Sequence, residues 1–99
     1  MDKDWYRINN VEDIPSPSLV VFPKRIEENI KLMIKIAGGA EKLRPHIKTH
    51  KIAEIINMQL NQGIKKFKCA TISEAELLAK CNAKDILLAM QLTGSNINR

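Results

Sequence analysis

Ser18-Leu19-Val20-Val21-Phe22, followed at once by Pro23, is the stretch that decides the fold. After Ser18 the run is continuously apolar and includes the β-branched pair Val20-Val21, as in a strand that is covered on both faces. Pro23 suits the first turn of a helix, where its missing N–H costs no hydrogen bond. Residues 23–37 then carry apolar side chains at helical spacing, and Gly38-Gly39 supplies a helix end. The stretch predicts a strand over 18–22 and a helix over 23–37.

The same alternation continues toward the carboxyl end of the chain. Short strand candidates lie at 42–48, 67–70 and 85–89, and helical patterns lie between them at 51–62 and 73–81. Ser73 and Glu76 have the spacing of a capping box at the start of the last helix. The predicted order is β-α-β-α-β-α-β, a parallel α/β unit with right-handed crossovers. An open doubly wound sheet and part of a barrel both fit this order.

Length and composition limit the architecture. A closed eight-stranded α/β barrel needs about 250 residues, and this chain has 99. Apolar residues make up 44 % and charged residues 27 %, which is typical of a soluble folded domain. We expect residues 1–17, which end in Pro15-Ser16-Pro17, to be a lead-in, and residues 18–99 to form one partial α/β domain. Residues 97–99 have the pattern of the start of a further helix.

Charge and cysteine usage bear on partners and location. The chain has 16 Lys and Arg against 11 Asp and Glu, a net charge of +5, but the basic residues are spread out and no aromatic stacking pattern accompanies them. A solvated basic surface is therefore favoured over nucleic-acid binding. Cys69 and Cys81 form no CxxC motif and are interpreted as free thiols. Because the amino terminus is polar and no apolar run reaches 18 residues, we expect a cytoplasmic protein without a membrane span.

The stretch with the most chemistry is Arg44-Pro45-His46-Ile47-Lys48-Thr49-His50-Lys51. In a strand, Arg44, His46 and Lys48 share one face, and His50 joins them if the strand continues. Three interpretations stay open at this point: a polar strand end in solvent, a metal site on the two histidines, or a nucleophilic lysine. Two histidines are too few for zinc without distant ligands. Neighbouring positive charge and partial burial would favour a neutral Lys48 amine, which can attack a carbonyl.

Several segments together resemble the N-terminal part of the alanine-racemase-like, fold-type III pyridoxal-phosphate enzymes, in the branch of D-threonine aldolase and D-serine dehydratase. The resemblance begins at residues 16–21, is most specific at 43–51, and continues through 68–76 and 85–89. It implies the first half of a TIM (β/α)8 barrel of the alanine racemase N-terminal type. It also implies that Lys48 binds pyridoxal 5'-phosphate as a Schiff base, and that His46 and His50 orient Lys48 or contact the cofactor or substrate.

The implied function is that of a lyase acting on a small D-amino acid. In the resembling enzymes, the loops that grip the phosphate and the ligands of a divalent metal (Zn or Mn) lie beyond the length of this chain, so no metal ligand is expected within it. We expect the chain to be the N-terminal fragment of a longer enzyme, to have little turnover alone, and to form a homo-oligomer, most simply a dimer. A racemase, a non-catalytic pyridoxal-phosphate-binding or carrier module, and a small basic interaction domain are the alternatives.

Overall fold

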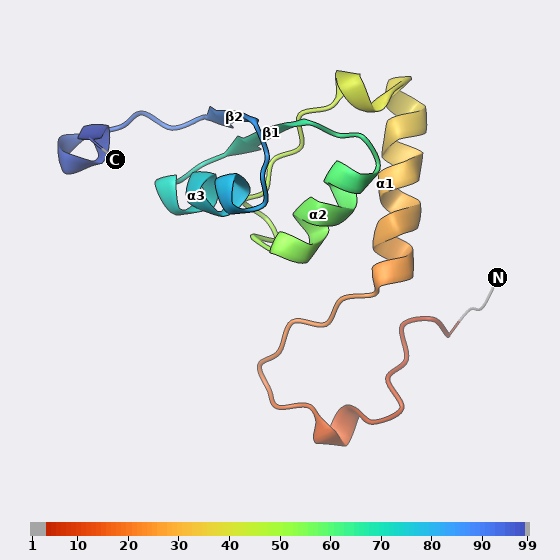
Figure 1. The fold of residues 1–99 in the computed structure, drawn as a ribbon. Helices are drawn as coiled ribbons and strands as arrows, with labels where there is room; N and C mark the ends of the chain where they lie inside the picture. Colours follow the sequence, from red (N-terminus) through yellow and green to blue (C-terminus); the bar gives the residue numbers. More distant parts are fainter. Residues whose placement is uncertain (1–3, 99) are drawn as a thin grey trace.

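A computed structural model describes residues 4–98 of the chain. Within them three α-helices and two β-strands form the body of the domain (Figure 1). Their order is α1 (Pro23–Ala37), α2 (Ala53–Asn61), β1 (Lys66–Cys69), α3 (Ile72–Lys80) and β2 (Asp85–Leu88). Short 3-10 turns lie at η1 (Val11–Asp13), η2 (Ala40–Lys42) and η3 (Gly94–Asn98).

The sheet consists of two paired strands and one bridging segment. β1 and β2 are parallel, in a register that runs from Lys66 beside Asp85 to Cys69 beside Leu88. His46 forms a single parallel bridge with Lys68, because the Ile47 N–H donates to the Lys68 carbonyl at 3.0 Å and the Lys68 N–H donates to the Pro45 carbonyl at 2.9 Å. Three parallel segments therefore lie side by side, in the order 45–47, β1, β2.

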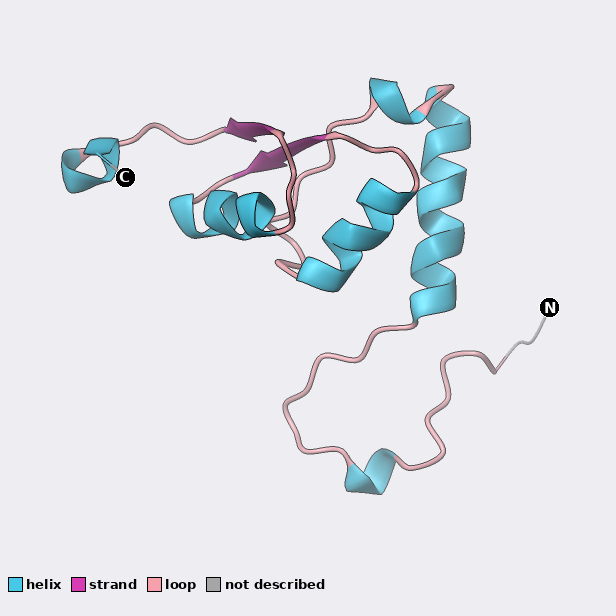
Figure 2. Cartoon of the chain, in the orientation of Figure 1, coloured by secondary structure: helices cyan, strands magenta, loops and turns pink. Residues whose placement is uncertain are grey.

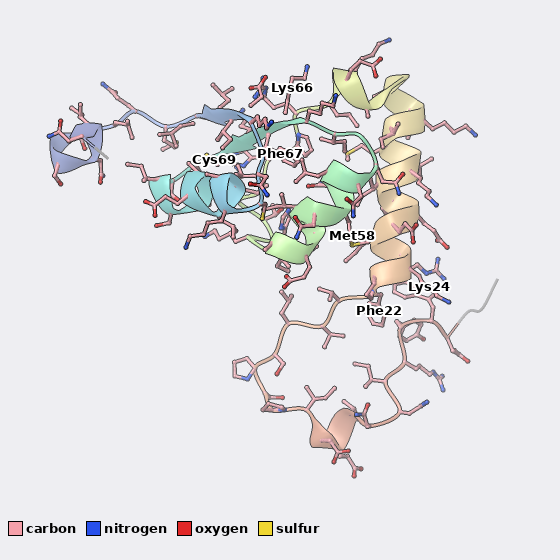
Figure 3. All side chains as sticks on the ribbon, viewed as in Figure 1. Phe22, Lys24, Met58, Lys66, Phe67 and Cys69 are labelled. Atoms are coloured by element: carbon pink, nitrogen blue, oxygen red, sulfur yellow. The ribbon has the colours of Figure 1, made fainter. Side chains whose placement is uncertain are left out.

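α3 packs against β1 and β2, α2 lies beside α3 on the same side of the sheet, and α1 packs against α2 (Figure 2). Phe67 and Cys69 lie between β1 and the helices, whereas Lys66 lies on the opposite side (Figure 3). Ile47, Ile56, Ile64, Phe67, Cys69 and Leu78 are fully buried and form the centre of the core. The alternation of buried and partly exposed residues along β1 places the core on the helix side and leaves the other face of the sheet open.

The prediction of a paired strand over 18–22 is wrong. These residues are extended but pair with no strand among the described residues, and Leu19 is 76 % exposed. The segment belongs to an arm that leaves the body at the start of α1 (Figure 1). Pro17 and Pro23 bracket the run and lack N–H groups, so neither can donate to a strand ladder. An apolar run shows that a segment is suited to burial, but a strand forms only where a second backbone supplies the hydrogen bonds.

The strand predicted at 42–48 is also not formed at full length: the structure has one bridge there, at His46. Pro45 lacks an N–H group, and after Ile47 the chain turns, because the Lys51 N–H donates back to the Ile47 carbonyl at 2.9 Å. The complete β-α-β-α-β-α-β unit is therefore not formed within residues 4–98. The parallel α/β arrangement of the remaining strands and helices is confirmed.

The helices follow the sequence prediction more closely than the strands do. α1 has the predicted bounds, and Gly38 ends it in the left-handed conformation (φ 86°), with its N–H donating to Ile34 and Lys35 carbonyls. α2 begins two residues later than predicted, because Lys51 has a φ of 55°, outside the helical region. β1 and β2 differ from the predicted 67–70 and 85–89 by one residue at their ends.

Candidate active site

The open face of the sheet carries the polar residues of the predicted site. Ile47 is fully buried on the helix side, so the alternation of side chains places Arg44 and His46 on the other face. His46 is paired with Lys68, and Lys68 is paired with Leu87, which is 48 % exposed. These pairings make a row of side chains across the open face, close to the carboxyl ends of the strands, where parallel α/β sheets bind ligands.

Lys48 follows this strand segment directly and is exposed at the first position of a turn over residues 48–50. The turn is closed by the hydrogen bond from the Lys51 N–H to the Ile47 carbonyl. Within residues 4–98, no hydrogen bond or ion pair involves the Nζ of Lys48. The structure therefore presents a lysine amine at the carboxyl edge of the sheet with its donors available to a ligand.

The two histidines of the predicted site bind backbone groups of this turn. His46 Nδ1 accepts the Lys48 N–H at 3.2 Å, and His50 Nδ1 accepts the Ile52 N–H at 2.9 Å. His50 is half-buried, and burial lowers its pKa from the ordinary value of 6.5. Since the chain turns after Ile47, the strand does not continue, and the expectation that His50 shares the strand face through such a continuation is wrong.

Arg44 lies at the other end of the strand segment and has a different role. Its Nη1 donates to the Phe67 carbonyl at 3.1 Å and forms an ion pair with Asp85 Oδ1 at 2.7 Å. The hydrogen bond from Arg44 lowers the pKa of Asp85, and the nearby positive charge of Arg44 acts in the same direction. Arg44 thus ties together three adjacent parallel segments at their amino ends, away from the turn that carries Lys48.

Glu74 is a residue of this edge that the sequence analysis missed. It is 4 % exposed, and its carboxylate accepts the Ala70 N–H at 3.1 Å and the Thr71 hydroxyl at 3.0 Å. The Thr71 hydroxyl in turn accepts the Glu74 N–H at 3.1 Å, so Thr71 is the N-cap of α3 and the predicted Ser73–Glu76 capping box is wrong. The Thr71-x-x-Glu74 spacing directly after β1 is the sequence signal that would have located it.

The surroundings of Glu74 favour its charged form. The hydrogen bond from the Ala70 N–H is the main cause that lowers its pKa, and burial opposes this effect. The bond from Thr71 and the positive charge of Lys51 lower the pKa further. A buried carboxylate therefore lies within electrostatic reach of the turn that carries Lys48.

Two hollows lie at the ends of the strands. One of about 230 Å³ lies at the carboxyl ends, between β1, β2 and the start of α3, with Ala70, Thr71 and Met90 in its wall. This volume is below the roughly 300–1,000 Å³ of typical small-molecule pockets, and Lys48 does not line it. A wider one of about 760 Å³ lies at the amino ends, beside Lys66 and Asp85. Its position is opposite to the edge where parallel α/β sheets bind ligands.

Comparison with protein families identifies this arrangement. The family model described as "Alanine racemase, N-terminal domain" matches residues 21–98. The chain belongs to the alanine racemase N-terminal domain family. The resemblance proposed from residues 43–51 is therefore confirmed, and the family fold is of the TIM-barrel type.

The alanine racemase N-terminal domain described here also resembles a curated enzyme. It is 33 % identical over 82 residues to a D-threonine aldolase of Arthrobacter sp. The alignment includes 82 % of this chain but 22 % of the aldolase, so the chain spans about a fifth of its relative's length. No solved structure matches the chain.

The residues of this family domain fit an attachment site for pyridoxal phosphate, because Lys48 is exposed at the carboxyl edge and its amine has no partner within residues 4–98. Among residues 4–98 no group of three His, Cys, Asp or Glu side chains has the arrangement of a metal site. No helix among the described residues is long and apolar enough to span a membrane. The domain boundary at 17/18, dimer formation and the roles of Lys48, His46 and His50 remain predictions.

Proposed function

We propose that this chain is the part of a pyridoxal-phosphate-dependent lyase that carries the cofactor-attachment residue, Lys48. The proposed substrates are D-amino acids with a β-hydroxyl group, as in a D-threonine aldolase. The observation that carries the proposal is the unpaired Lys48 amine at the carboxyl edge of a parallel α/β sheet. Membership of the alanine racemase N-terminal family and the similarity to a D-threonine aldolase support it.

The residues of the chain have separate tasks in this proposal. When bound, pyridoxal phosphate supplies an electron sink for cleavage of a bond to the substrate carbon. Lys48 holds the cofactor through its Nζ, and once released, the same amine takes or returns a proton at the substrate. His46 holds the backbone of Lys48 through the bond to its N–H. Arg44 and its ion pair with Asp85 hold the strand that leads to the turn.

The rest of the proposed site lies outside this chain. The hollow at the carboxyl edge is small, and its wall comes from residues 70–73, Leu88, residues 90–92 and Asn96. The contacts to the cofactor phosphate, and any divalent Zn or Mn ion of the enzyme, therefore come from the remainder of a protein of the relative's length. Turnover is a property of that whole protein in our proposal.

The first test identifies the attachment residue. The full reading frame that contains this chain is produced, incubated with pyridoxal phosphate and reduced with borohydride, and the modified lysine is located by peptide mass mapping. We expect modification at Lys48, loss of it in Lys48→Ala, and retention of it in the matched controls Lys51→Ala and Lys68→Ala. Modification spread evenly over the lysines, or unchanged in Lys48→Ala, would refute the proposal.

The second test identifies the reaction. With D-threonine, an aldolase of this type releases glycine and acetaldehyde in equal amounts, whereas a racemase inverts only the α-carbon, forms L-allo-threonine and releases no aldehyde. We expect the first outcome, on the strength of the aldolase relative. The racemase is the second candidate, because the matching family is named after alanine racemase. Attachment at Lys48 without aldehyde, without inversion and without release of ammonia, which a dehydratase would form, would leave a non-catalytic cofactor-binding module and refute the lyase.

A further inference from the structure

We infer that His46 and His50 are positioning residues that fix the backbone around Lys48 through their Nδ1 atoms. The inference rests on the proposed function of Lys48 and assigns to each histidine one atom and one task. It replaces two other tasks that the sequence leaves open for them, a direct contact to the cofactor and the binding of a metal.

The geometry consists of two hydrogen bonds of the same kind, one at Lys48 and one four residues later. In each, a histidine side chain accepts the backbone N–H of the residue two positions later: His46 from Lys48, and His50 from Ile52. The first bond holds Lys48 itself. The second holds Ile52, the N-cap residue of α2, so it fixes the point where the turn joins the helix.

The backbone between these two bonds is tightly constrained. The Lys51 N–H donates to the Ile47 carbonyl at 2.9 Å, and Lys51 has a φ of 55°. A non-glycine residue in the left-handed region is strained, and this conformation persists only where surrounding contacts hold it. The two histidine bonds and the turn bond are such contacts. They hold the main chain at Lys48 while its Nζ remains free.

This arrangement also determines the tautomer of both rings. A neutral imidazole that accepts at Nδ1 carries its proton at Nε2. The Nε2 of His50 is buried and has no hydrogen-bond partner within the described residues. Burial lowers the pKa of His50, which favours the neutral ring that the Nδ1 bond requires. A protonated ring would have a donor at Nδ1 and would lose the bond to the Ile52 N–H.

Asparagine and glutamine variants separate the two ring nitrogens. The Oδ1 of asparagine accepts a backbone N–H two residues later, as in an Asx turn, so it replaces Nδ1. Glutamine places its terminal amide farther from the backbone, near the position of Nε2. Alanine removes both. Thr49→Ala is the matched control, because Thr49 lies in the same turn, is exposed and takes part in neither histidine bond.

The first measurement needs no cofactor. Amide hydrogen exchange of Lys48 and Ile52 is followed in the full protein without pyridoxal phosphate, by mass spectrometry with fragmentation to single residues. Loss of a hydrogen bond worth about 0.5–1.5 kcal/mol corresponds to a roughly 2- to 12-fold faster exchange. We expect this acceleration at Lys48 in His46→Ala and His46→Gln, and at Ile52 in His50→Ala and His50→Gln. The asparagine variants and Thr49→Ala should exchange like the unaltered protein.

The second measurement links the backbone to Lys48. The pyridoxal phosphate concentration that gives half-maximal modification of Lys48 should be higher in the alanine and glutamine variants than in the unaltered protein. In the asparagine variants it should equal the value of the unaltered protein. The inference is overturned if glutamine restores either readout and asparagine does not, because Nε2 is then the acting atom. It is also overturned if alanine variants exchange at the original rate. Absence of Lys48 modification in the unaltered protein, with the exchange pattern intact, instead overturns the proposed function.

Discussion

Replacement of Glu74 by alanine is the perturbation whose cost the structure defines best. The substitution removes a carboxylate that is 4 % exposed and accepts two hydrogen bonds, at 3.1 and 3.0 Å. It also leaves the Ala70 N–H, at the end of β1, without its acceptor. Hydrogen bonds to charged groups contribute about 1.5–3 kcal/mol each, and a buried donor left unpaired costs about 1–3 kcal/mol. Since the Thr71 hydroxyl can still cap the Glu74 N–H position, we expect a net loss of roughly 2–4 kcal/mol.

Urea unfolding at pH 7, followed by circular dichroism, measures this loss directly. Two variants serve as controls. Glu74→Gln keeps an acceptor in place and should cost about 1 kcal/mol or less. Ser73→Ala, at the exposed position that the sequence pattern assigned to the cap, should change the free energy of unfolding by about 0.5 kcal/mol or less. A loss of about 0.5 kcal/mol or less for Glu74→Ala would show that the Thr71–Glu74 box does not stabilise α3.

The pH dependence of the same variants checks the charge of Glu74. Its pKa is lowered in the folded chain, so the unfolded chain takes up protons first as the pH falls. The stabilisation is therefore fully present above the ordinary value of 4.5 and is lost as the pH falls through the lowered pKa. The difference in stability between the unaltered chain and Glu74→Gln should shrink over this range. A difference that stays constant down to pH 3 would contradict a charge effect.

Three further substitutions or conditions test the fold and the site. Phe67→Ala empties a fully buried position on β1 and should cost about 3–5 kcal/mol in urea unfolding, while Leu87→Ala on the open face should cost far less; equal losses would contradict the one-sided core. Because burial lowers the pKa of His50, stability should decrease as the pH falls through 6.5, and urea titrations at several pH values should find a weaker decrease in His50→Asn; an equal slope would show that His50 is not the group responsible. Asp85 has a pKa lowered by Arg44, so its stabilising effect should be lost below 3.8. Acid unfolding of Asp85→Asn should accordingly show a smaller pH dependence, and an unchanged curve would mean that the ion pair contributes nothing.

The helices could be predicted from the sequence because their determinants are local. Residues 23–37 combine a proline suited to the first turn, apolar side chains at helical spacing and a glycine end, and all three signals act within one segment. The capping box of α3 is also local, but the pattern occurs twice, at Thr71-x-x-Glu74 and Ser73-x-x-Glu76. The structure uses the first, because Glu74 can also accept the Ala70 N–H at the end of β1.

The strands were harder to predict because a strand depends on a partner far away in the sequence. The run at 18–22 has the composition of a buried strand, yet no second backbone lies along it among the described residues. The segment around His46 has a partner in β1, but Pro45 and the turn after Ile47 limit the pairing to one bridge. Composition thus identified segments that suit a sheet, and backbone donors determined which of them joined it.

The candidate site combines both kinds of determinant. Lys48 could be selected from the sequence because residues 44–51 combine basic side chains and histidines in one short segment. The resemblance to a family of known fold pointed to the same lysine. The roles of His46 and His50 could not, since they depend on whether the chain continues as a strand or turns. Once it turns, each imidazole accepts a backbone N–H at its Nδ1, while the Lys48 amine has no hydrogen-bond or ion-pair partner within residues 4–98. In our proposal, a turn built in this way contributes a fixed main chain and an accessible Lys48 amine, and the rest of the pocket comes from other parts of a protein of the relative's length.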